Sequence, residues 1–172
     1  MLLDPDYCVM MARYNAWQNR QLRTIFEELD DAKLRKNRKA FFGSIFATAN
    51  HLLWGDMLWI SRFDGGPGPD VDASGHATFT PTPAAWAGDR YRMDARILRW
   101  ADTLHAVDLY SDLTWVSGEL GREIRRSMGQ CVVNFFNHQT HHRGQIHAML
   151  TAAGSDAPVS DLAVMPEDGP WL

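Results

Sequence analysis

The chain has 172 residues, 45% of them hydrophobic and 22% charged, which fits a single domain spanning residues 1–172 with a full core. The formal net charge is −4 and no basic stripe is present, which argues against a nucleic-acid partner, because phosphates are met by lysine and arginine. The sequence has no uncharged run long enough to cross a bilayer, no signal-peptide pattern and only two cysteines, so we expect a cytoplasmic protein without a membrane partner.

Two helical patterns occupy the first part of the chain. Apolar residues recur at helical spacing over residues 7–29, and Asp4 followed by Pro5 is a plausible start for this helix. The second pattern, residues 41–63, is apolar on most faces. It stops at DGGPGPD, residues 64–70, because glycine and proline end helices.

Two further helices and a hairpin are predicted in the second part. Thr82 and Pro83 are a suitable N-cap and first residue for a helix that runs to about residue 104. Two strand-like runs around SGELG, residues 117–121, predict a small β-hairpin. The last helix is expected over residues 128–153, with Gly154 just beyond its end. Four amphipathic helices with one long crossover indicate an all-α fold, a four-helix bundle whose sites face inward.

The last helix holds four of the seven histidines within ten residues. At about 100° per residue, His138 and His142 lie about 40° apart at the inner edge of the apolar face, one turn from each other. His141 and His147 lie on other faces and are expected at the surface. Imidazoles four residues apart on a helix can reach one metal ion, although this spacing alone also occurs in surface or core histidines.

The second helix offers a partner for this pair in His51. The residues that share its face are mostly small: Ser44, Ala47, Thr48, Gly55 and Leu58. An unfilled gap in a core costs stability, so this face indicates that another group occupies the space. We therefore predict a divalent metal site formed by His51, His138 and His142. Three protein ligands leave coordination positions open, which is typical of catalytic metal sites.

Several other residues receive a structural interpretation. Cys131 lies about 10 Å along the helix from His138 and is expected to be a core cysteine. His76 and His105 have no partner pattern and are expected to be exposed. Arg143 and Gln145 leave two interpretations open: they orient the histidines, or they tie the last helix to the first. Asparagines of the first helix, Asn15 and Asn19, are expected to be structural hydrogen-bonding residues.

Three motifs resemble the DinB/YfiT-like metalloenzymes of the DinB superfamily. They are YNAWQNRQL at 14–22, NHLLWGDMLWISRF at 50–63 and NHQTHHRGQIHAML at 137–150. Their order and spacing, together with the hairpin before the last helix, extend the resemblance over nearly the whole chain. It implies an up-down-down-up four-helix bundle, commonly a homodimer, in which His51, His138 and His142 hold a divalent metal.

The resemblance also implies a reaction. Relatives use the metal to activate a low-molecular-weight thiol for transfer to a small electrophile, so we expect a metal-dependent thiol S-transferase or a related detoxifying enzyme. Zinc or nickel is the first expectation for the metal, with iron or manganese as alternatives. No catalytic side chain is assigned.

Two other functions stay open at this point. A metal-dependent hydrolase would need a general base, and Asp56, about 140° from His51 on the same helix, faces elsewhere. The other alternative is a non-catalytic metal-binding module of a stress response. Seven tryptophans and eight methionines favour a homodimer, since some apolar surface should remain after one small core is filled.

Overall fold

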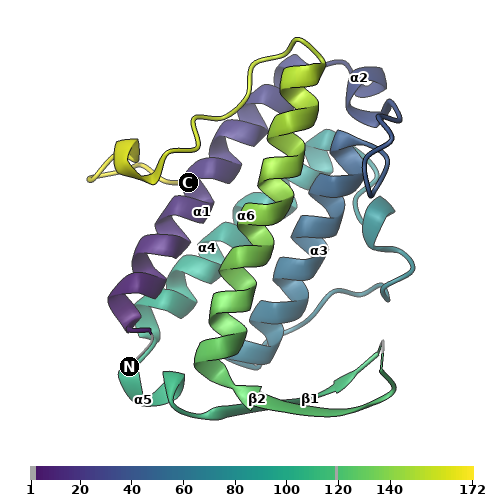
Figure 1. The fold of residues 1–172 in the computed structure, drawn as a ribbon. Coiled ribbons are helices and arrows are strands. Elements are labelled where there is room, and N and C mark those ends of the chain that lie inside the picture. Colours follow the sequence, from purple (N-terminus) through teal and green to yellow (C-terminus); the bar gives the residue numbers. More distant parts are fainter. Residues whose placement is uncertain (1–2, 119) are drawn as a thin grey trace.

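The computed structural model describes residues 3–118 and 120–172. Four long helices dominate it, and they lie side by side (Figure 1): α1 (Pro5–Glu28), α3 (Ile45–Asp64), α4 (Pro83–Thr103) and α6 (Met128–Ala152). Helix α1 contacts α4 and α6, and α3 contacts the same two helices. Each long helix therefore has two neighbours and buries one face against them.

Shorter elements connect the long helices. They are α2 (Asp31–Arg35), the 3₁₀ turn η1 (His76–Thr78), α5 (Ala106–Leu109), the strands β1 (Asp112–Ser117) and β2 (Arg122–Ser127), and the 3₁₀ turn η2 (Leu162–Val164). The strands form the predicted antiparallel hairpin directly before α6, with Trp115 opposite Ile124. The short helices were not predicted, because four or five residues are too few to show a helical period.

Capping residues close to each terminus determine where the long helices begin and end. Asp4 accepts a hydrogen bond from the Tyr7 amide at 2.8 Å, and Thr82 accepts one from the Ala85 amide at 3.1 Å, so both predicted N-caps are confirmed. Gly154 has a φ of 67° directly after the C-cap of α6, as predicted.

The predicted start of the second helix at residue 41 is wrong. Helix α3 begins at Ile45, because the Ser44 hydroxyl caps it by accepting from the Ala47 amide at 3.1 Å. The chain turns just before this cap, where Gly43 has a φ of 81°. Apolar residues that precede the cap had extended the helical pattern too far.

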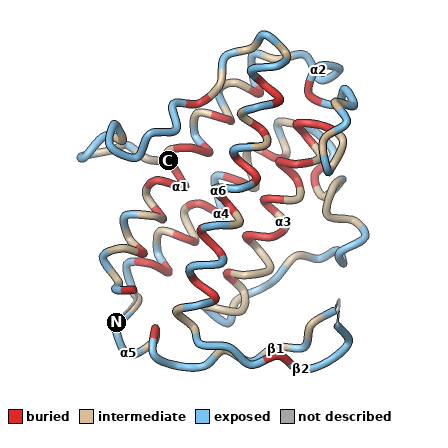
Figure 2. The backbone as a smooth tube through the Cα atoms, viewed as in Figure 1, coloured by how far each residue is buried: buried red, intermediate tan, exposed pale blue. Residues whose placement is uncertain are grey.

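The interior between the long helices is apolar and aromatic. Figure 2 shows that the buried positions follow the inward faces of α1, α3, α4 and α6. Fully buried large side chains include Leu22, Phe46, Leu53, Trp86, Ile97, Phe135, Phe136 and Ile146. Cys131 is also buried, at 3% exposed, which confirms that it is a core cysteine. No helix in the described part of the chain is both long and apolar enough to cross a membrane.

A buried ion network lies within this core. Arg90 of α4 donates from Nη1 to Asp56 of α3 at 2.6 Å, and its Nη2 lies 2.8 Å from Oδ1 of Asp94. All three side chains are at most 1% exposed. Burial raises the pKa of Asp94 to about 6, although Arg90 opposes this rise.

Polar residues of α1 and α6 complete the network. Asn15 and Asn19 donate to Oδ1 of Asp94 at 3.1 and 2.9 Å, which confirms that both asparagines are structural hydrogen-bonding residues. Gln139 of α6 donates to Asp56 at 3.1 Å. The network thus links all four long helices through polar groups that would be costly to bury alone.

Candidate metal centre

The three histidines predicted as ligands converge at the contact between α3 and α6. Each of His51, His138 and His142 offers a ring nitrogen, and these atoms lie within 4.8 Å of one another. The Nε2 atoms of His51 and His138 are 3.2 Å apart. The ring centroid of His142 lies 4.4 Å from that of His138 and 4.6 Å from that of His51. Three imidazoles from two helices therefore surround one small volume.

Gly55 makes this convergence possible. It lies one turn after His51 on α3, and a Cβ atom built on it would be 2.9 Å from Cε1 of His138. Any larger residue would push into the imidazole ring. The small-residue face of α3 is thus filled by a histidine from α6, as the sequence pattern indicated.

A fourth histidine joins the cluster, and the prediction that it is exposed is wrong. His76, in η1, has its Nδ1 atom 3.2 Å from Nδ1 of His51. The connection between α3 and α4 folds back against α3 and carries His76 with it. Such an approach leaves no periodic signal in the sequence. His105 is exposed, as predicted.

An aromatic side chain covers the cluster. The ring centroid of Phe42 lies 4.1 Å from that of His51, 5.1 Å from that of His76 and 5.4 Å from that of His142. Phe42 belongs to the turn before α3 and was not singled out from the sequence. Its position limits the access of water to one side of the imidazoles.

The sequence left two roles open for Gln145 and Arg143, orienting the histidines or tying the last helix to the first, and each residue has one of them. Oε1 of Gln145 accepts from Nδ1 of His142 at 2.8 Å, and its amide nitrogen lies 3.1 Å from Nε2 of His141. Gln145 therefore orients His142 and leaves Nε2 of that ring free. Arg143 instead donates to Oδ1 of Asn15, which ties α6 to α1.

The electrostatics of the cluster favour neutral rings. Burial, with smaller contributions from the neighbouring histidines, lowers the pKa of His51 to about 3. Burial also lowers the pKa of His142 to about 4, although the hydrogen bond that His142 donates to Gln145 opposes this shift. The pKa of His138 is lowered by burial as well, while Asp56 opposes the shift. All three rings are thus neutral at pH 7, the form that binds metal ions.

The distance between the ring nitrogens of His51 and His138 fits two ligands of one divalent ion. Two nitrogens bound at 2.0–2.1 Å to a tetrahedral zinc ion are about 3.3 Å apart, close to the 3.2 Å between His51 and His138. A donor set of three imidazoles suits zinc, nickel, copper or iron. Asp56 belongs to the buried ion network, where it accepts from Arg90 and Gln139.

The fold and this cluster define a class: a helical protein with three histidines converging between two of its long helices. The DinB family model matches residues 4–168, and the chain therefore belongs to the DinB family. Protein DinB of Bacillus subtilis (strain 168) is a relative that is 24% identical over 157 residues, covering 91% of each chain. The resemblance seen in the three sequence motifs is confirmed.

Proposed function

We propose that this protein binds a divalent metal through His51, His138 and His142 and uses it as a thiol S-transferase or a related detoxifying enzyme. This proposal rests on the convergence of three neutral imidazoles from α3 and α6. Zinc or nickel is the first choice for the metal, with iron or manganese as alternatives. The proposal includes an up-down-down-up four-helix bundle for the long helices.

The residues around the ligands have defined tasks in this proposal. Gln145 holds His142 with Nε2 free, and His76 contacts the far nitrogen of His51. Phe42 shields the rings from water on one side. When bound, a metal with open positions lowers the pKa of a coordinated thiol, so that the thiolate forms near neutral pH.

The thiol in this proposal comes from a separate small molecule. Both cysteines are buried, and burial raises the pKa of Cys8 to about 12 and also raises the pKa of Cys131. Neither belongs to the histidine cluster. A thiolate is its own nucleophile, so this reaction does not need Asp56 as a general base, whereas a hydrolase would need such a group.

Cobalt substitution tests the proposal. We expect a thiolate-to-cobalt absorption band when a small thiol such as cysteine or glutathione is added, and His142→Ala should abolish the band and the transfer of the thiol to an electrophile. His147→Ala is the matched control on the same helix and should retain both. Cleavage of a test ester without any thiol band would favour the hydrolase. Metal binding with neither activity would favour the non-catalytic module.

We also propose a homodimer of cytoplasmic, single-domain chains. Exposed apolar side chains support the dimer, among them Val107, Tyr110 and Val133, and the last two line one surface pocket together. A second copy of the chain would remove these side chains from water. Sedimentation at micromolar concentration tests this assembly, and a single species with the mass of one chain would contradict it.

A further inference from the structure

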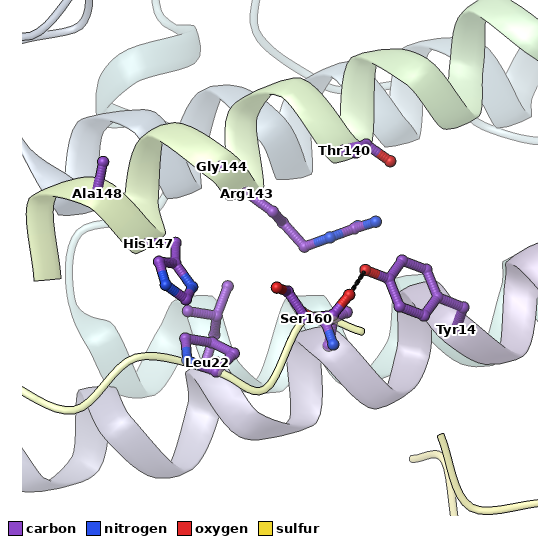
Figure 3. A pocket seen from close by; sticks show the side chains of 10 residues that line it. Tyr14, Leu22, Thr140, Arg143, Gly144, His147, Ala148 and Ser160 are labelled. Atoms are coloured by element: carbon purple, nitrogen blue, oxygen red, sulfur yellow. Dashed lines mark hydrogen bonds between the residues drawn. The ribbon is translucent and has the colours of Figure 1, made fainter. Parts of the chain in front are cut away.

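A cavity of about 330 Å³ lies on the side of α6 that faces α1. Its lining comes from α1, α6 and the C-terminal segment and includes none of the three proposed ligands (Figure 3): Tyr14, Gln18, Leu22, Thr140, Arg143, Gly144, His147, Ala148, Pro158 and Ser160. The floor residues Tyr14, Gln18, Leu22 and Pro158 are buried. The rim residues Thr140, Gly144, Ala148 and Ser160 are exposed, so the cavity opens to solvent.

Arg143 is the charged group of this cavity, and its side chain runs from α6 toward Tyr14 (Figure 3). It is only 7% exposed, yet within the described residues no carboxylate oxygen lies within 4.0 Å of it. The two buried carboxylates, Asp56 and Asp94, are both held by Arg90. A buried guanidinium without a partner carboxylate is costly unless its donors are used.

The donors of Arg143 are used on one side only. Nη1 donates to Oδ1 of Asn15, whereas Nη2 is buried and has no hydrogen-bond partner among the residues that the structure describes. Nε likewise makes no hydrogen bond to a described residue. Nε and Nη2 form one edge of the planar guanidinium, and such an edge matches the two oxygens of a carboxylate.

The rest of the cavity indicates the body of the ligand. Leu22, Pro158 and the ring of Tyr14 give it an apolar floor, while His147 lies at its side (Figure 3). Two other polar groups of the lining are already used: the Tyr14 hydroxyl donates to the Ser160 carbonyl at 2.6 Å, and Gln18 donates to the Val159 carbonyl at 2.5 Å. A free inorganic oxyanion has no apolar part and would leave the apolar floor exposed to water.

We propose that this cavity binds a small organic carboxylate, with its hydrocarbon part on the apolar floor and its oxygens on the Nε–Nη2 edge of Arg143. Because Nη2 is closed to solvent, the guanidinium has to turn toward the cavity when the ligand binds. A purely structural role for Arg143, as a tie between α6 and α1, accounts for Nη1 and Asn15. It accounts neither for the unused edge nor for the cavity that Arg143 lines. This site is independent of the proposed metal chemistry.

Gly144 allows the cavity to be filled without touching Arg143. A Cβ atom built on Gly144 meets no atom of another described residue within 4 Å outside its own helix backbone, and Gly144 lines the cavity. Gly144→Leu should therefore fold, because leucine is also a better helix former than glycine by about 1 kcal/mol. Ala152→Leu adds the same side chain at an exposed position of α6 outside the cavity and serves as the control.

The experiment is an NMR titration of amide signals with butyrate and benzoate, and with the neutral butyramide and benzamide. It is run on the metal-free and on the zinc-loaded protein, since a carboxylate can also bind a metal. We expect saturable shifts at Gly144 and His147 with the carboxylates in both forms, and binding of the amides weaker by about tenfold or more. Gly144→Leu should abolish these shifts, and Ala152→Leu should retain them.

Three results would overturn the proposal. They are equal binding of carboxylates and amides, no shift at Gly144 and His147 in the wild-type protein, and unchanged binding by Gly144→Leu. One form of the second result is a set of shifts confined to His51 and His138 in the zinc-loaded protein, which would place the carboxylate at the metal.

Discussion

The Nδ1 atom of His51 lies 3.2 Å from the Nδ1 atom of His76. A hydrogen bond between two imidazole nitrogens needs a proton on one and a free lone pair on the other. If Nε2 of His51 gives its lone pair to a metal, its Nδ1 carries the proton and His76 is the acceptor. His76 then fixes the ring orientation of His51 in the way that outer partners fix metal-binding histidines.

Replacing His76 should therefore weaken metal binding without removing a ligand. We expect His76→Ala to lower zinc affinity by about 10–100-fold, the usual effect of losing such a partner. His51→Ala should lower it further, because that variant loses a ligand. Competition with a chromophoric chelator measures both. His105→Ala, at an exposed histidine, is the control, and equal affinities for His76→Ala and this control would refute the assigned role.

Gly55→Ala should separate metal affinity from stability. The new Cβ atom would lie 2.9 Å from Cε1 of His138, so the imidazole has to tilt and carry Nε2 away from its partners. We expect zinc affinity to fall by about tenfold or more. The free energy of unfolding of the metal-free protein should change little. Alanine favours the helix by about 1 kcal/mol over glycine, and this gain offsets the cost of the tighter contact with His138.

The control for this variant is Gly144→Ala, where the added methyl group contacts no other part of the described chain within 4 Å outside its own helix backbone. Gly144→Ala should leave zinc affinity unchanged. Affinity is read from chelator competition and stability from urea unfolding of the same samples. A Gly55→Ala protein that binds zinc as tightly as the wild type would show that the site tolerates a displaced His138.

The metal-free protein should lose stability as pH falls from about 6.5 toward 4. In the unfolded chain a histidine takes up its proton near pH 6.5, whereas burial lowers the folded pKa of His51 to about 3 and that of His142 to about 4. The unfolded state thus binds more protons throughout this window, so acid favours unfolding. Urea unfolding at several pH values measures the slope. The double variant His51→Gln/His142→Gln should show a shallower slope, and an equal slope would contradict the assignment.

Two arginines of α4 offer a comparison of buried and exposed charge. Arg90→Ala should destabilise the protein by about 3–5 kcal/mol, because it leaves Asp56 and Asp94 buried without a cation. Arg92→Ala should cost less than about 1 kcal/mol, since the Arg92 side chain is 72% exposed and its ion pair with Asp89 is solvated. Urea unfolding of the two variants tests this difference. Equal losses would show that the buried network does not depend on its ion pairs.

Features encoded by neighbouring residues were predictable from the sequence. The caps at Asp4 and Thr82 were correct because a cap needs only one side chain and the amides that follow it. The pair His138 and His142 was identifiable because helical spacing determines their relative direction. The prediction of His51 depended on one more observation: the residues that share its helix face are mostly small. They indicated that another group fills the space beside this histidine.

Features that depend on long connections were not predictable in this way. His76 approaches His51 only because the connection between α3 and α4 folds back, and such a path has no period that a sequence pattern can reveal. Phe42 reaches the cluster from a turn that the pattern had assigned to a helix. The contact of Arg90 with Asp94 follows from their spacing, whereas its contact with Asp56 depends on how α3 and α4 pack.

The buried ion network also has a consequence for how the molecule unfolds. Each long helix contributes a member: Asn15 from α1, Asp56 from α3, Arg90 from α4 and Gln139 from α6. A helix that detached alone would leave buried charges or amides without their partners, and the cost of that state would approach the cost of complete unfolding. The central amides of all four helices should therefore exchange with deuterium at one common free energy, as a single cooperative unit.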